Sequence, residues 1–285
     1  MRVLIINALD GRLDRLQAVL DQQHSAIAAV FVLGNITPAG ARRQAYQAQV
    51  RNGQIPAPVI EALDRESRGT GPSYANVFTL LGNLGVPVYL IPGEHDAPFT
   101  TLTAALQTHW GTGRLVLAHR AVHALPNGDA VAGFGGLLTA ARDDARLLLH
   151  FPDWMVQNAF ENLAAFSSVF REARRRIFLF AMPPRATNLD LYGGAHTGDS
   201  TLNTIIKTYS PHLVCCGGSD GTRGIEVIED ALVIRPGSLV DGSYAVVDLD
   251  GMQAHLAWLD AQPAIDAGMV AAAVHNGSYE VGAGI

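Results

Sequence analysis

Short apolar runs alternate along the chain with longer amphipathic stretches. The runs are four to six residues long, are rich in Val, Ile, Leu and Phe, and most of them end at a turn that contains Gly or Pro. This alternation is typical of buried strands and covering helices in an α/β domain. We expect strands at Arg2–Ile6, Ala29–Leu33, Pro87–Ile91, Ile177–Phe180, His212–Cys216, Ala231–Ile234 and Tyr244–Leu249.

Three other stretches complete the predicted organisation. Asp153 is placed to cap a helix whose apolar face extends to Phe170, and the arginines at 171–176 would interact with its C-terminal dipole. The polar segment 41–73 predicts one or two surface helices or a flap, because structureless loops of this length are uncommon. We therefore expect one domain over 1–260, with 41–73 as an insertion, and an Ala/Gly-rich C-terminal extension over 261–285.

Composition places the chain among globular proteins with a large core. It has 285 residues, of which 48% are hydrophobic and 16% charged, and a net charge of −6. Such a charge makes nucleic acid an unfavourable partner. Cys215 and Cys216 are adjacent, so they form neither an ordinary cross-linking disulfide nor a CxxC zinc site. The apolar run Val3–Ile6 is too short for a secretory signal or a membrane span, and we expect a cytoplasmic chain.

The turns that follow the predicted strands carry the candidate chemistry. Sites in α/β sheets gather where strands end, at their carboxyl edge. In chain order these turns are Asn7-Ala8-Leu9-Asp10-Gly11, Gly34-Asn35, Gly93-Glu94-His95-Asp96, Ala181-Met182-Pro183-Pro184 and Gly217-Gly218-Ser219-Asp220-Gly221.

This ordered set resembles the calcineurin-like metallophosphoesterases, whose blocks read roughly D-x-H-G, G-D, G-N-H-[DE], H-x-P-P and G-H-x-H-G. A later segment, Arg235-Pro236-Gly237-Ser238, matches the family's N-P-G-S with Arg in place of Asn. The resemblance extends over nearly the whole chain, from Met1 to about Leu259. It implies an α/β fold of four layers, an αββα sandwich in which two mixed β-sheets pack face to face. It also implies two metal ions that supply a hydroxide and hold the phosphate oxygens.

The chain departs from the family pattern at the first metal position. The family's Asp and His correspond here to Ala8 and Asp10, and its bridging Asp corresponds to Asn35. The second His of the last block corresponds to Asp220. Three oxygen donors therefore replace the family's mixed ligand set.

The departures at the second metal position are larger. Asn35 again stands at the bridge, and Glu94 replaces the family's Asn ligand. Ala181 and Gly218 replace two His ligands and offer no lone pair, as does Ala8 at the first position. A neutral amide at the bridge also removes the charge that holds two dications together. The resemblance thus implies a degenerate site that does not hold two metals.

Two residues of the third block keep the family's residue types. His95 stands at the catalytic His position, where an imidazole would contact the phosphate or protonate the leaving oxygen, and Asp96 could orient the ring. Without metals, the same pair would also fit a structural turn held by hydrogen bonds.

Three functions stay open. The first is a pseudoenzyme that binds no cofactor and acts as a binding or assembly protein for an unknown protein partner or a phosphate-containing small molecule, with a homo-oligomer as the base-rate expectation. The second is a slow phosphoesterase or phosphodiesterase with His95 as the acid and one Mn or Mg ion. Its oxygen ligands would be Asp10, Asn35, Glu94 and Asp220. The third is a phosphate or nucleotide sensor, in which Gly-rich turns and Arg235 hold the anion.

Overall fold

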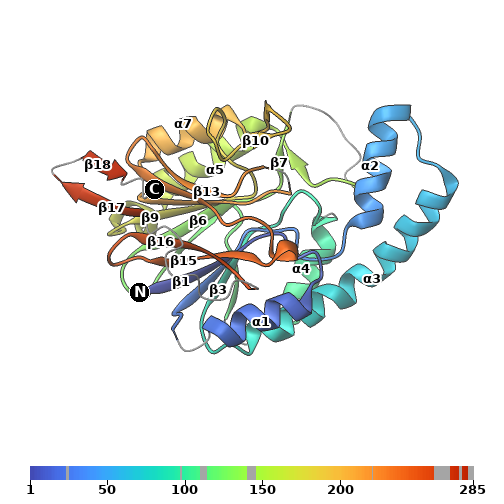
Figure 1. Cartoon of the computed structure of the whole chain (residues 1–285), viewed down its shortest axis with the longest axis horizontal. Helices are drawn as coiled ribbons and strands as arrows, with labels where there is room; N and C mark the ends of the chain where they lie inside the picture. The colour runs from blue at the N-terminus through green and yellow to red at the C-terminus, as the bar shows by residue number, and fades with distance from the viewer. Residues whose placement is uncertain are drawn as a thin grey trace.

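The predicted apolar runs form two stacked β-sheets (Figure 1). This computed structural model describes residues 1–23, 26–96, 98–109, 114–139, 146–219, 221–259, 270–275 and 278–281. The first sheet has the strand order β18-β17-β16-β15-β1-β2-β3-β4. Its strands are β1 Arg2–Ile6, β2 Ala29–Val32, β3 Val88–Leu90, β4 Leu115–Leu117, β15 Ser243–Asp248, β16 Gln253–Trp258, β17 Val270–His275 and β18 Ser278–Val281.

Parallel pairing at the centre of this sheet places three of the candidate turns side by side. β2 pairs in parallel with both β1 and β3, and Ile6, Val32 and Leu90 lie in register where these strands end. β15 to β18 continue the sheet on the other side of β1 with antiparallel pairing. The part of the predicted extension 261–285 that the structure describes thus adds strands to this sheet.

The second sheet has the strand order β13-β14-β12-β9-β6-β5. Its middle strands are parallel and its edge strands β13 and β5 are antiparallel to their neighbours. The bounds are β5 Ala121–Ala124, β6 Ala130–Phe134, β9 Arg176–Phe180, β12 Leu213–Cys216, β13 Gly224–Ile228 and β14 Ala231–Arg235. Two small ribbons lie beside it, β7 Leu137–Leu138 with β8 His150–Phe151 and β10 Leu191–Tyr192 with β11 Ala195–His196.

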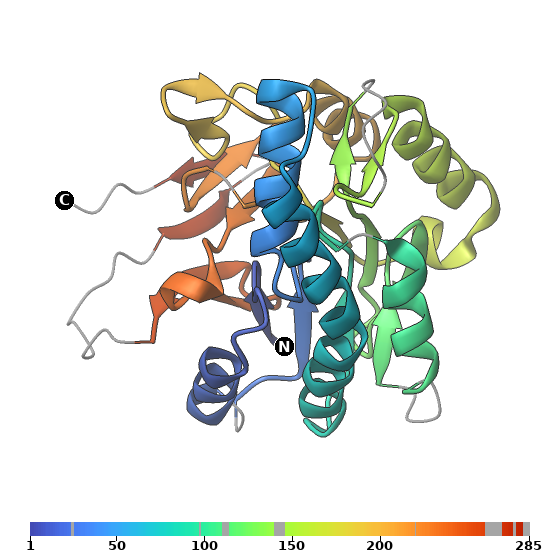
Figure 2. The same ribbon diagram turned by 90° about the vertical axis from the view of Figure 1, so that its right-hand side faces the viewer.

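Alternation of side chains along the strands builds three apolar layers. Between the sheets, Ile5 and Phe31 of the first sheet share a buried cluster with Leu179 of the second. The outer face of the first sheet packs against α1 Leu13–Gln23, α3 Ala57–Gly82 and α4 Phe99–Gln107. The outer face of the second packs against α5 Asp153–Phe166, α6 Ser168–Glu172 and α7 Ser200–Tyr209. The predicted αββα sandwich is confirmed (Figures 1 and 2).

The stretch predicted as one helix with an arginine-rich end is instead two helices. Asp153 is the first residue of α5, and Pro152 occupies the cap position. The Ser167 hydroxyl accepts a hydrogen bond that caps the separate helix α6. Arg171 donates to carbonyls at the end of α5, as the dipole argument predicts. Arg174 does not, because it pairs with the fully buried Asp129.

Segment 41–73 lies in two helices, α2 Gly40–Asn52 and the first part of α3. Both run across one edge of the sandwich and are visible on the right of Figure 1 and in front in Figure 2. The Glu66 carboxylate of α3 accepts hydrogen bonds from the backbone N–H groups of Ala41 and Arg42, which fixes the start of α2. In the ranges described above, no helix has the length and apolar character that crossing a bilayer requires.

Candidate functional site

The turns after β2 and β3 contact each other through two glycines. A Cβ on Gly34 would stand 2.1 Å from the Gly93 nitrogen, and Gly34 has a φ of +95°. Only glycine accommodates both this backbone conformation and this approach. The contact places Asn35, Glu94 and His95 within one small volume at the edge of the first sheet.

The orientation of the Asn35 side chain follows from its hydrogen bonds. Its Oδ1 accepts from the backbone N–H of His95 at 3.0 Å, and a backbone N–H can only donate. Nδ2 must therefore be the atom that points the other way, where it donates to Glu94 Oε1 and Ser219 Oγ at 3.1 Å each. The Asn35 side chain consequently directs N–H groups, and not a lone pair, toward the centre of the site.

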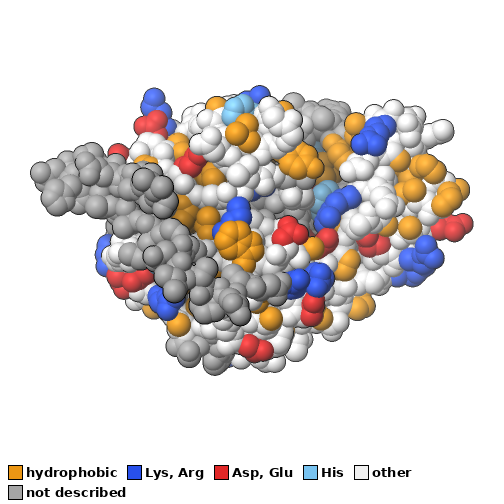
Figure 3. Space-filling view, viewed as in Figure 1, with side chains coloured by type: hydrophobic (Ala, Val, Ile, Leu, Met, Phe, Trp, Pro, Cys, Tyr) orange, Lys and Arg blue, Asp and Glu red, His pale blue; other side chains and the backbone are white. Residues whose placement is uncertain are grey.

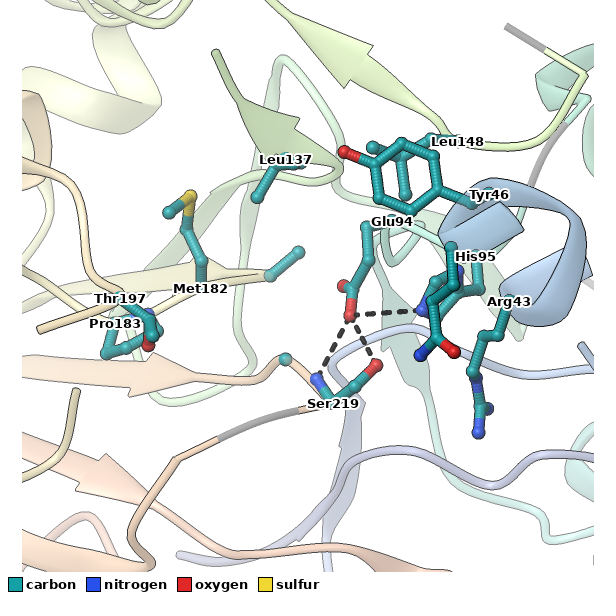
Figure 4. Close-up of a pocket in the computed structure, with 13 residues that line it drawn as sticks. Arg43, Tyr46, Glu94, His95, Leu137, Leu148, Met182, Pro183, Thr197 and Ser219 are labelled. Carbon is teal, nitrogen blue, oxygen red and sulfur yellow. Dashed lines mark hydrogen bonds and ion pairs between the residues drawn. The ribbon is translucent and has the colours of Figure 1, made fainter. Parts of the chain in front are cut away.

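Glu94 is held by donors from both sheets. Its Oε1 accepts from the Asn35 amide. It also accepts from the backbone N–H and hydroxyl of Ser219, which follows β12 (Figure 4). Burial raises the pKa of this carboxyl, but attraction to His95 and the hydrogen bonds from Ser219 and Asn35 outweigh burial, so the pKa lies below its ordinary value. Glu94 is therefore a fixed carboxylate at neutral pH.

His95 is buried beside this carboxylate without a direct hydrogen bond to it. Its Nε2 lies 3.9 Å from Glu94 Oε1, and its Nδ1 has no hydrogen-bond partner within the part of the chain that the structure describes. Burial lowers the pKa of His95, as do Arg43 and Arg42, and these effects exceed the opposing attraction of Glu94 and Asp10. The ring is thus predominantly neutral near pH 7.

Asp96 does not orient the His95 ring, in contrast to the role predicted for it. Its Oδ1 accepts from the backbone N–H of Ile36 and from the Tyr74 hydroxyl, and its Oδ2 accepts from the backbone N–H of Gly93. The side chain is fully buried. Asp96 therefore joins the turns after β2 and β3 to helix α3. This role corresponds to the alternative prediction of a structural turn held by hydrogen bonds.

Asp10 is engaged by α2 and by the loop before it. Its Oδ2 pairs with Arg43 Nη2 at 2.8 Å, and its Oδ1 accepts from the Ala39 backbone N–H. Ala8, Asp10 and Asn35 all adopt positive φ angles near +50°, a conformation unfavourable for residues with a Cβ. Hydrogen bonds between the turns, such as Asp10 N–H to the Asn35 carbonyl, hold them there.

The turns of the second sheet bring small and apolar side chains to the same place. Ala181, Met182 and Pro183 follow β9, and Gly218 follows β12. A Cβ on Gly218 would stand 3.1 Å from Arg235 Nη2. The Arg235 side chain, only 2% exposed, donates to the Leu189 carbonyl and lies beneath this turn.

These turns and α2 enclose a cavity of about 340 Å³ (Figure 4). A hollow is visible in the space-filling view where α2 meets the sandwich (Figure 3). Arg43 and Ser219 also line a smaller cavity of about 140 Å³ that contains Asp10 and Ala8. Arg43 and Ser219 therefore stand between Asp10 on one side and Glu94 with His95 on the other.

The binuclear metal pair does not fit the residues that the structure describes. Among them, no three His, Cys, Asp or Glu side chains are arranged to hold a metal ion. Asn35 presents N–H groups where a bridging ligand must present lone pairs. Asp220, the fourth predicted ligand, lies outside the described residues, so the single-ion site stays a prediction.

Two residues of the site were not predicted from the sequence. Ser219 stands at the unspecified position of the G-H-x-H-G block, and Arg43 belongs to a helix without a motif. Ser219 could have been predicted, because its hydroxyl can form hydrogen bonds and because it lies in a turn already given as a candidate site. Nothing in the local sequence distinguishes Arg43 from Arg42, which is instead fully buried and donates to the His95 carbonyl.

Comparison with known proteins shows the family. The model of the family described as "Metallophosphoesterase, calcineurin superfamily" matches residues 1–257, and the chain belongs to this family. No curated protein matches the sequence.

Solved structures agree with this fold over nearly the whole chain. One crystal structure, 24% identical, covers 91% of this chain and 99% of its own with a TM-score of 0.79. TT1561 of Thermus thermophilus is 20% identical, with coverages of 90% and 98% and a TM-score of 0.69. A dimetal phosphatase from Danio rerio is 11% identical, with coverages of 90% and 95% and a TM-score of 0.56. At these identities the likeness concerns the fold alone.

Proposed function

We propose that this chain is a metallophosphoesterase-family protein that has lost binuclear phosphoester hydrolysis and acts by binding a ligand in the cavity beside Glu94. The orientation of the Asn35 amide carries this proposal. Its N–H groups point at Glu94 and Ser219, where two metal ions would require a shared anionic ligand. Hydrogen bonds among protein groups thus take the place of metal coordination.

Three further positions support the same proposal. Ala8, Ala181 and Gly218 offer no lone pair at positions where the family resemblance implies metal ligands. The Arg235 guanidinium approaches Gly218 closely enough to crowd a larger side chain there. The Arg235 side chain thereby leaves little room for a larger side chain at position 218.

The two alternatives have weaker support from the geometry. A single-metal phosphoesterase would need Asp10 as a ligand, but both oxygens of this carboxylate already accept hydrogen bonds or an ion pair. A phosphate or nucleotide sensor would need Arg235, whose side chain is 2% exposed and donates to the Leu189 carbonyl. It lines, together with Arg223, a separate cavity of only about 150 Å³. A protein partner and a homo-oligomer stay as proposals without a specific contact to support them.

The test is metal content per chain together with hydrolysis. Tag-free protein is exposed to Mn²⁺, Mg²⁺ or Zn²⁺, dialysed, and analysed for bound metal, and its hydrolysis of bis(p-nitrophenyl) phosphate is measured. We expect almost no retained metal and no metal-dependent turnover. Retention of one or more ions per chain that is lost in Asp10→Asn, but not in the exposed control Asp14→Asn, would overturn the proposal.

A further inference from the structure

The floor of the cavity carries a carboxylate oxygen with unused hydrogen-bonding capacity. All hydrogen bonds to the Glu94 side chain come to Oε1, from Asn35 and Ser219. Among the described residues, Oε2 accepts none. Figure 4 shows this second oxygen turned away from Ser219, toward the space between Leu137 and Met182. A ligand in the cavity would therefore meet an acceptor whose position is already fixed.

The charge at this floor is negative. Arg43 is the cation of the cavity lining, and Asp10 already pairs with it at 2.8 Å. His95 lies beside Glu94 in the same lining, with its Nε2 3.9 Å from Glu94 Oε1. Among the described residues that line the cavity, Glu94 thus has no Lys or Arg partner, because Arg43 is already paired with Asp10. In the absence of a dication, a phosphate at this floor would be repelled, whereas a cation would be attracted.

The opposite wall is apolar. Leu137 and Leu148 contribute to it from the β7–β8 region, and Met182 and Pro183 from the turn after β9. These side chains offer a hydrophobic surface to the apolar part of a ligand whose charged group lies at Glu94. The cavity is thus divided into an anionic floor and an apolar wall.

We infer that the cavity binds an organic cation, an ammonium or guanidinium group on an apolar stem, with the charge on Glu94 Oε2 and the stem against Leu137, Leu148 and Met182. This inference rests on the proposed function, because a divalent metal at the floor would reverse the charge that the ligand meets. It also predicts a preference opposite to that of a phosphate-binding site built on the same fold.

Calorimetric titration of chelator-dialysed full-length protein with three probes of similar stem tests the inference. The probes are phenethylamine, phenethyl alcohol and phenyl phosphate. We expect phenethylamine to bind most tightly and phenyl phosphate least. Glu94→Gln should weaken phenethylamine binding about ten- to a hundredfold, the loss of one charged hydrogen bond, and should spare the alcohol. The exposed α3 substitution Glu61→Gln is the matched control and should change nothing.

Two further arms keep the result interpretable. Leu137→Ala should weaken binding of phenethylamine but not of methylammonium, which lacks the stem, so that each half of the cavity is tested by a separate variant.

N-acetyl-lysine amide presents the same ammonium group as a protein partner would. Tighter binding of this compound than of phenethylamine would assign the cation to a lysine side chain, and weaker binding to a small molecule.

The outcomes separate the inference from the proposed function. Absence of phenethylamine binding, tighter binding of phenyl phosphate, or unchanged amine affinity in a folded Glu94→Gln variant would overturn the inference alone, provided that the chain retains no metal. Metal retained at the floor would overturn both.

Discussion

The two sheets contribute different chemistry to one cavity. The turns after β1, β2 and β3 supply side chains that form a connected set of hydrogen bonds, centred on Asn35, Glu94 and Asp96. The turns after β9 and β12 supply Ala181, Met182, Pro183 and Gly218 to the lining of the cavity. These residues shape the cavity but contribute few polar groups to it. Ser219 is the exception, since its hydroxyl and N–H cross from the second sheet to Glu94.

This difference shows how a site can change its chemistry without losing its shape. On the first sheet the polar residues hold the turns in place, so each substitution there affects both structure and chemistry. On the second sheet the backbone turns persist with side chains that make few polar contacts. We expect substitutions on the first sheet to cost stability and those on the second to be tolerated, and four predictions test this contrast.

The largest effect is expected for Asp96→Ala. This change leaves the backbone N–H groups of Ile36 and Gly93 and the Tyr74 hydroxyl without their buried acceptor. Each unsatisfied donor is costly, and we expect a loss of about 3–5 kcal/mol in the free energy of unfolding. Urea denaturation measures it, with the exposed Asp14→Ala as the control. A loss within about 0.5 kcal/mol would show that the polar set does not hold the turns.

The next effect is a pH dependence from His119, at the border between the sheets. Burial among aromatic rings lowers the pKa of His119 to about 3, from an ordinary 6.5. The unfolded chain therefore binds a proton below pH 6.5 that the folded chain does not bind until near pH 3. The contribution of this residue to stability is complete above pH 6.5 and should fall by about 2 kcal/mol by pH 5.

The substitution His119→Gln isolates the contribution of His119 to the pH dependence of stability. Its amide oxygen can accept the hydrogen bond that His119 Nδ1 now accepts from the Gly135 N–H. Denaturation curves between pH 5 and pH 7 should be flatter for the variant than for the parent chain. Equal slopes in the two proteins would contradict the prediction.

Asn35→Asp should have a smaller effect, with a distinctive pH profile. The change places a second carboxylate beside Glu94 and removes the donor at 3.1 Å. Repulsion raises the pKa of the pair, so the penalty of about 1–2 kcal/mol applies at neutral pH and diminishes as the pH falls toward 5. Unfolding free energies at several pH values, with and without Mn²⁺, provide the measurement. Strong stabilisation by Mn²⁺ in the variant alone would show that the amide is what excludes the metal.

Met182→Leu should have the smallest effect of the four. The side chain lines the apolar wall, and the substitution conserves hydrophobicity and approximate volume. We expect a loss below about 1.5 kcal/mol, even though Met182 Sδ accepts a hydrogen bond from the Leu138 N–H. A loss as large as that of Asp96→Ala would remove the contrast between the two sheets.

Much of the architecture could be predicted from the sequence because it depends on local patterns. The predicted strands correspond to β1, β2, β3, β9, β12, β14 and β15 within a residue or so at each end. The adjacent cysteines also follow the strand pattern, with Cys215 in the core between the sheets and Cys216 in the core beneath the helices. Strands β4, β5, β6, β13 and β16 were not predicted, because their apolar runs are short or are interrupted by glycine or polar residues.

The chemistry of the site could be predicted only in part, because it depends on contacts between distant residues. The family resemblance selected Asn35 and Glu94, but the direction of the Asn35 amide is set by a backbone N–H sixty residues away, at His95. The same holds for Asp96, whose partners come from the turn after β2 and from α3. No pattern along the chain specifies which of these donors a buried carboxylate meets.

The contact between Gly34 and Gly93 has a consequence for how this protein relates to sequences with other ligand sets. Because two backbones touch there, the spacing of the turns is fixed before any side chain is chosen. A different set of functional groups can therefore be installed through side-chain replacements alone at Ala8, Asn35 and Ala181, without rebuilding a loop. Replacement of Gly218 is more strained, since its φ is +103° and a Cβ there would stand 3.1 Å from Arg235 Nη2. Three of the four turns can therefore change their chemistry by a single substitution, and the turn after β12 is the most constrained.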